Sequence, residues 1–150
     1  MLIKPPSPAW ALTLLLACMP SWADDAVIGF VKTVQGDATV VAANQTIKAE
    51  PGTPVKTSYI LKTGKPGSMG ITLKDNTLLS IGPDTELVVE EFLYDPAQDD
   101  LKLGANLSKG TLNYISGVIA KLKPKAVSVR TPTGTIGVRG THFVAKVVPE

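Results

Sequence analysis

The chain has 150 residues, with 15 lysines and arginines against 13 aspartates and glutamates, and a formal net charge of +2. Nucleic-acid-binding proteins need a concentrated basic surface and aromatic side chains for stacking, so near-neutral charge and only 5% aromatic residues argue against that class. The single cysteine, Cys18, leaves no disulfide framework within the chain. The length suits one domain with its own core.

The first 23 residues follow the pattern of a secretion signal. Lys4 precedes an apolar run over 9–19, about eleven residues long, against the roughly twenty that a membrane-spanning helix needs. Ser21-Trp22-Ala23 places small residues at the two positions that a signal peptidase recognises. We therefore expect residues 1–23 to be removed and one mature domain over 24–150.

Cys18 offers a second cleavage site. Leu15-Leu16-Ala17-Cys18 resembles the lipobox of bacterial lipoproteins, in which the chain is cut before the cysteine and the thiol is acylated. A leucine directly before the small residue is unusual in that pattern. We expect the soluble form, and a membrane contact through lipid at Cys18 is the alternative.

The mature region predicts an all-β domain, because its apolar residues alternate with period two and glycine separates short runs of Val, Ile and Thr. Gly36-Asp37, Asp75-Asn76 and Gly82-Pro83-Asp84 predict turns. The acidic stretch over 90–100 predicts a surface loop. The expected strands lie at 28–34, 38–41, 69–73, 77–81, 87–89 with the pattern continuing to Tyr94, 111–119, 126–130, 136–138 and 142–148.

Glycines at positions 36, 52, 67 and 82 recur about every fifteen residues. Regular corners of this kind are typical of a twisted β-solenoid, in which stacked coils bury each other's faces. An antiparallel β-sandwich has turns at similar spacing. The spacing leaves both single-domain architectures open.

The C-terminal third resembles the signature of the FecR domain family, in which a strand leads to Thr-Pro and then to a Val-Arg-Gly-Thr-x-Phe box. The earlier segments Gly29 to Gly36, Gly52–Thr57 and Gly67–Thr77 also follow the order of the family, so the resemblance covers residues 27–148. The signature residues are Thr131, Pro132, Val138, Arg139, Gly140, Thr141 and Phe143.

The resemblance implies a protein of the Gram-negative envelope. The members that define the family pass an iron-siderophore transport signal from an outer-membrane receptor to a cytoplasmic sigma factor, and their periplasmic part includes a β-solenoid-like unit. This sequence shows no sigma-binding helical region with a membrane anchor and no further receptor-contacting domain. We therefore expect a stand-alone periplasmic FecR domain that binds another envelope protein, in signalling or regulation. The alternative is a structural or polysaccharide-associated envelope protein.

Arg139 is the first candidate binding residue. Its guanidinium offers five donors in a planar fork suited to carboxylates. Glycines at 137 and 140 let the backbone turn or approach another strand closely. The side chain could face an acidic partner, or it could tie a corner of the fold to Asp84 or Glu86, which is the arrangement we expect.

The second candidate is the run Lys121, Lys123 and Lys125. On a strand, alternation places the three lysines on one face, where they could bind a phosphate-bearing lipid or a polysaccharide. Lysines on an edge strand also discourage aggregation between sheets, and we favour this explanation.

Nothing in the sequence predicts catalysis or a cofactor. His142, the only histidine, has no ligand spacing around it, and the acidic stretch lacks the Asx-Gly pattern of calcium loops. No nucleophile elbow or phosphate loop occurs. We expect a protein that is not an enzyme and binds no metal or cofactor.

Overall fold

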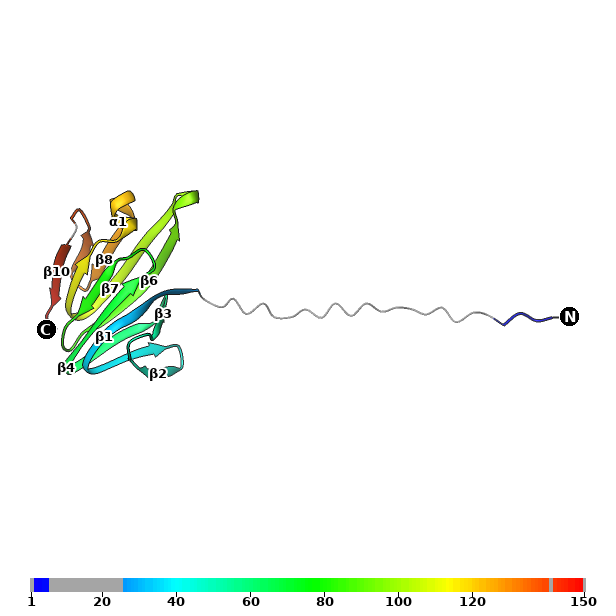
Figure 1. Ribbon diagram of the computed structural model, residues 1–150, viewed down its shortest axis with the longest axis horizontal. Helices are drawn as coiled ribbons and strands as arrows, with labels where there is room; N and C mark the ends of the chain where they lie inside the picture. Colours follow the sequence, from blue (N-terminus) through cyan, green and yellow to red (C-terminus); the bar gives the residue numbers. More distant parts are fainter. Residues whose placement is uncertain (1, 6–25, 141, 150) are drawn as a thin grey trace.

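The computed structural model describes residues 2–5, 26–140 and 142–149 (Figure 1). Most of the predicted secretion signal, including Cys18 and the expected cleavage site, lies outside the described residues. No helix in the described part is long and apolar enough to cross a membrane. The described domain is built almost entirely from strands, as the sequence predicts.

Ten strands form one sheet, with a short α-helix and two 3-10 turns between them. The strands are β1 (Val27–Ala42), β2 (Gln45–Lys48), β3 (Pro54–Lys56), β4 (Ile60–Leu73), β5 (Leu78–Ile81), β6 (Glu86–Asp95), β7 (Asp100–Ile115), β8 (Val127–Thr131), β9 (Gly134–Gly137) and β10 (His142–Val147). The helical segments are η1 (Pro96–Gln98), α1 (Val118–Leu122) and η2 (Pro124–Ala126).

Four of these strands close into a small barrel. β4 pairs with both β5 and β6, and β7 pairs with the same two strands. The outer strands extend this ring. β1 pairs with β4 and also with β2 and β3, and β7 pairs also with β8 and β10. β9 pairs with β8, and β7–β8 is the one parallel pair among the described strands.

The long strands bend so that the sheet can close. β1 runs through Gly36, where the chain has a φ of 66° and the pairing register with β4 shifts. β5 and β6 follow one another around the turn at 82–85, and β7 bends beside them at Gly110, whose φ is 92°. A positive φ of this size suits glycine, because a side chain would collide with the backbone.

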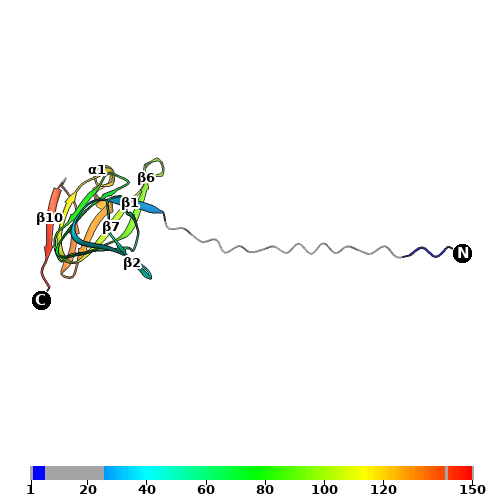
Figure 2. The same ribbon diagram turned by 60° about the horizontal axis from the view of Figure 1, so that its bottom comes forward.

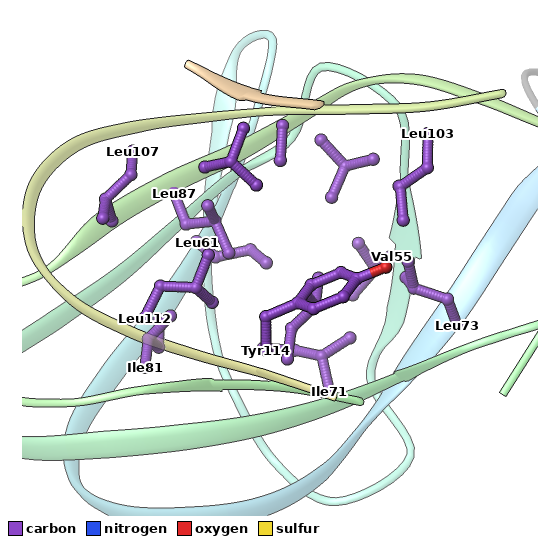
Figure 3. Close-up of a cluster of buried hydrophobic side chains, with 14 of the residues drawn as sticks. Val55, Leu61, Ile71, Leu73, Ile81, Leu87, Leu103, Leu107, Leu112 and Tyr114 are labelled. Carbon is purple, nitrogen blue, oxygen red and sulfur yellow. The ribbon is translucent and has the colours of Figure 1, made fainter. Parts of the chain in front are cut away.

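The core consists of rows of apolar side chains that lie opposite one another across neighbouring strands. One row crosses five strands: Val31, Ile71, Leu79, Tyr114 and Phe143. The first four of these are at most 2% exposed. Figure 3 shows the Tyr114 ring among aliphatic side chains, including Val55, Ile71 and Leu73. Strand alternation explains these rows, since every second residue faces the core.

The structure corrects the predicted architecture. The described strands neither stack as solenoid coils nor divide into two separate sheets, because almost all neighbours are antiparallel and one sheet closes on itself. The predicted turn at Gly36-Asp37 is wrong: the chain continues as one strand with a bulge. The turns at Asp75-Asn76 and Gly82-Pro83-Asp84 are confirmed.

Two further segments differ from the prediction. The acidic stretch over 90–100 is mostly strand, because β6 continues to Asp95 and forms a long hairpin with β7 that turns at η1. The strand expected over 111–119 ends at Ile115, and the chain then forms α1. Both views place α1 at the same end of the molecule as the β6–β7 turn (Figures 1 and 2).

Candidate functional site

The signature residues lie along the β8–β9 hairpin and the link to β10. Thr131 ends β8, and its hydroxyl donates to the carbonyl of Gly134 at 3.0 Å across the turn that contains Pro132. Val138 and Gly140 lie in the link, and Phe143 lies in β10. Thr141 is outside the described residues.

The backbone on both sides of Arg139 is anchored to the domain. Val138 is 4% exposed and belongs to the core. The Ser116 hydroxyl donates a hydrogen bond to the carbonyl of Gly140 at 2.8 Å. Further along, Phe143 stacks on Tyr114 with a centroid distance of 4.9 Å. These contacts hold the link against β7 and fix the place from which Arg139 projects.

The Arg139 side chain itself points to solvent and makes no hydrogen bond or ion pair with any described residue. The expected corner contact is wrong, because both proposed carboxylates have other partners. Asp84 binds Lys109 at 3.1 Å and Lys65 at 3.4 Å, and Glu86 binds Lys62 at 3.0 Å. Long-range ion pairs of this kind leave no local trace in the sequence.

The lysine run lies on helical segments, not on a strand. Lys121 is in the last turn of α1, Lys123 caps both α1 and η2, and Lys125 is in η2. The prediction of one strand face is therefore wrong, although all three side chains are exposed. The helix forms here because a buried carboxylate from the β4–β5 hairpin holds its first turn.

That carboxylate is Asp75, which is 0% exposed. One of its oxygens accepts a hydrogen bond from the Ile119 backbone N–H at 3.2 Å and from the Thr77 hydroxyl at 2.8 Å. Its other oxygen accepts from the Thr77 N–H at 3.1 Å, and its carbonyl accepts from the Val118 N–H at 2.8 Å. The N-cap residue of α1 is Gly117, which has no side chain to cap the helix, so Asp75 takes that role from a distant hairpin.

An open groove of about 800 Å³ lies between these helical segments and the arginine link. We call it the cationic groove. Residues 122–125 form one wall, Val127 and Ser128 of β8 lie along it, and residues 137–139 form the other wall. Its lining is mainly apolar, with the cations Lys123, Lys125 and Arg139 among it. The structure thus brings together the candidate binding residues Lys123, Lys125 and Arg139. Arg139 follows the two lysines by 16 and 14 positions in the sequence.

A family model described as FecR protein matches residues 59–149, more than half of the chain. The chain belongs to the FecR family. This family is linked to envelope signalling through anti-sigma regulation and is in general non-catalytic. No curated protein and no solved structure matches the chain.

One cation of the cationic groove of this FecR domain, Lys123, already contacts a carboxylate that lies outside the groove lining. The Lys123 ammonium lies 3.4 Å from a carboxylate oxygen of Asp99 and donates to the Asp99 carbonyl at 3.3 Å. Lys125 and Arg139 have no acidic partner among the described residues. An exposed pair such as Lys123–Asp99 contributes little stability, so another carboxylate could replace it at small cost.

The described residues of the FecR domain contain no group of three or more His, Cys, Asp or Glu side chains that could hold a metal ion. The Nε2 atom of His142 instead contacts the Asn113 side-chain oxygen on the neighbouring strand. Sequence reasoning missed two residues of this region: Leu122, whose side chain is 61% exposed in the groove, and Asp75. An apolar residue between two lysines, Lys121 and Lys123, was the one local signal for Leu122.

Proposed function

We propose that this FecR domain is a non-catalytic periplasmic module that binds another envelope protein through the cationic groove, with a role in envelope signalling. In this proposal residues 1–23 direct export and residues 24–150 form the working domain. The link between the family and envelope signalling supports this assignment. Attachment by lipid at Cys18 is the alternative to the soluble form, and fractionation of the envelope distinguishes them.

Arg139 carries the proposal. A guanidinium that stabilises a fold is normally paired, whereas this one faces solvent with its backbone fixed by buried Val138 and by the Ser116–Gly140 hydrogen bond. A fixed backbone lowers the conformational entropy lost on binding. The planar fork of arginine binds carboxylates in two parallel hydrogen bonds. This arrangement favours a binding role over a structural role.

The chemistry of the groove favours an acidic protein segment with an apolar side chain. Leu122 and Pro124 offer apolar surface for such a side chain, and Lys125 and Arg139 offer charges for carboxylates. The contact between Lys123 and Asp99 shows that one of these cations can pair with a carboxylate. The exposed lysines also support the second candidate, a structural or polysaccharide-associated protein, but a polysaccharide has less use for the apolar lining.

Capture from the cell envelope tests the proposal. The protein carries a photo-cross-linking residue at position 125, or at exposed Lys48 on β2 as a distant control. We expect one protein to cross-link at position 125 and not at position 48. Arg139→Ala should abolish that product without lowering the melting temperature, since the side chain has no described partner. Arg130→Ala is the matched control, because Arg130 pairs with Glu90 outside the groove.

Two other outcomes would contradict the proposal. Retention on peptidoglycan or surface polysaccharide with no cross-linked protein would support the second candidate. A lower melting temperature in Arg139→Ala would show that Arg139 stabilises the fold, and the main evidence that the groove binds a partner would be lost.

A further inference from the structure

β10 leaves one long edge of the sheet unpaired. It pairs with β7 along one side over all six residues, and none of the described strands pairs with its other side. A groove of about 520 Å³ runs between residues 145–148 and the β8–β9 hairpin, so the described chain leaves space beside this strand. Unpaired N–H and C=O groups on such an edge are a template for an added strand.

The other edges of the sheet are less suited to pairing. β2 has four residues, β3 has three and begins with Pro54, and β9 has four and both begins and ends with glycine. β6 is also open on one side beyond Val89, but Glu90, Glu91 and Asp95 in that stretch disfavour the addition of a strand. Proline and glycine weaken a strand or remove a donor from it. β10 contains neither and carries one lysine, Lys146. Of the described edges, β10 is the one best able to accept a further strand.

The sequence of β10 is complementary to itself. His142, Val144 and Lys146 point outward, and Phe143, Ala145 and Val147 point toward the core. A two-fold axis perpendicular to the sheet keeps outward residues opposite outward residues in an antiparallel pair. Centred on Val144, this pairing opposes Val144 to Val144, Phe143 to Ala145 and His142 to Lys146. Apolar pairs then form on both faces and no like charges are opposed.

We propose that two copies of this chain associate through their β10 strands, paired antiparallel about Val144, to extend the sheet across a dimer. The proposal is independent of the cationic groove and goes beyond it. Val144 is 62% exposed in the single chain, and in the dimer its partner covers it. A single strand pair is a small interface, so the dimer forms reversibly.

Opposite charges at position 144 test both the surface and the register. The protein is purified in the form that accumulates in the producing cell and studied by sedimentation velocity over about 10–500 μM, the range for weak association. Val144→Lys and Val144→Glu each oppose two like charges at the centre and should weaken self-association by about tenfold or more. An equimolar mixture of the two variants should restore the dimer.

Leu93→Lys is the matched control, because Leu93 is a 53% exposed apolar residue on the β6–β7 hairpin, away from β10. This variant should associate like the unchanged protein. The proposal is overturned by a protein that stays monomeric over the whole range, by a dimer that persists in both Val144 variants, or by a mixture that fails to associate. Tighter association of Val144→Glu alone would also overturn it, because Val144 would then face Lys146.

Discussion

At the residue scale, Tyr114 has its hydroxyl buried without a hydrogen-bond partner among the described residues. The neighbouring Ser116 and Thr77 hydroxyls direct their protons to Gly140 and to Asp75, so neither of them donates to the Tyr114 oxygen. A buried polar group without a partner destabilises a fold by roughly 1–3 kcal/mol. Tyr114→Phe should therefore leave the free energy of unfolding unchanged or raise it by about 1 kcal/mol, as measured by urea denaturation at pH 7.

Alkaline pH provides the control for Tyr114. Burial raises the pKa of its hydroxyl above the ordinary value of 10.0. The folded chain therefore holds this proton more firmly than the unfolded chain, and the stability that results is present below pH 10.0 and is lost as the pH rises toward the higher folded pKa. The unchanged protein should lose stability more steeply above pH 10 than Tyr114→Phe does. Equal slopes would contradict a buried hydroxyl.

Asp84 gives the opposite pH dependence. A hydrogen bond from the Lys109 ammonium lowers the pKa of this carboxyl below 3.8, with help from Lys65 and against the effect of partial burial. The stabilising pairs are present above pH 3.8 and are lost as the pH falls through the lower folded pKa. Asp84 has a φ of 50°, which asparagine tolerates, so Asp84→Asn removes the charge without straining the turn.

For this variant we expect a modestly lower melting temperature at pH 6 and a difference from the unchanged protein that shrinks as the pH falls below 3.8. Added salt should reduce the difference at pH 6, because the pairs are partly exposed. A difference that stays constant between pH 6 and pH 2 would mean that Asp84 acts through the turn and not through its charge.

At the scale of elements, the hydrogen bonds that Asp75 accepts hold α1 in place and so position one wall of the cationic groove. Asp75→Asn replaces one acceptor oxygen by an amide that faces N–H donors, and should lower the free energy of unfolding by roughly 1.5–3 kcal/mol. Asp95→Asn is the control, because Asp95 is exposed and its side chain makes no capping hydrogen bond at η1. Urea denaturation measures both variants. Equal stabilities would show that α1 forms without the carboxylate.

Local chemistry made some elements predictable and others not. Asp75-Asn76 and Gly82-Pro83-Asp84 form turns because their own backbone preferences specify them. The end of β7 depends instead on contacts across the sequence: Gly117 packs so closely on the β4–β5 turn that a Cβ would lie 2.4 Å from the Thr77 nitrogen, and Asp75 accepts from the first N–H groups of α1. The same holds for Arg139, because no local pattern shows that Lys65 and Lys109 are the partners of Asp84.

At the scale of the whole molecule, alternation correctly predicts that strands dominate, but it does not say which strands pair. β4 contacts β5 and β6 on successive parts of its length, and β7 does the same, so closure follows from where the long strands bend. Regular glycine spacing fits a solenoid equally well. The architecture depends on which distant strands pair and in which register. Local sequence patterns do not predict that pairing.

The bend in β7 offers the sharpest test of this closure. Buried Thr85 lies under Gly110. Its hydroxyl accepts from the Thr111 N–H at 3.0 Å, and its own N–H donates to the Thr63 hydroxyl at 3.0 Å, which joins β4 and β7 to the turn before β6. A Cβ at position 110 would lie 2.5 Å from the Thr85 Cα atom, with φ at 92°.

Gly110→Ala should therefore lower the free energy of unfolding by roughly 2–4 kcal/mol. Gly134→Ala is the matched control, because a Cβ there meets nothing within 4 Å, and its effect should stay within about 0.5 kcal/mol. Urea denaturation followed by circular dichroism compares the two variants. If the bend closes the whole sheet, Gly110→Ala shifts one cooperative transition, because the strands on both sides of the bend share a core. A second, separate transition would mean that the two ends of the sheet fold independently.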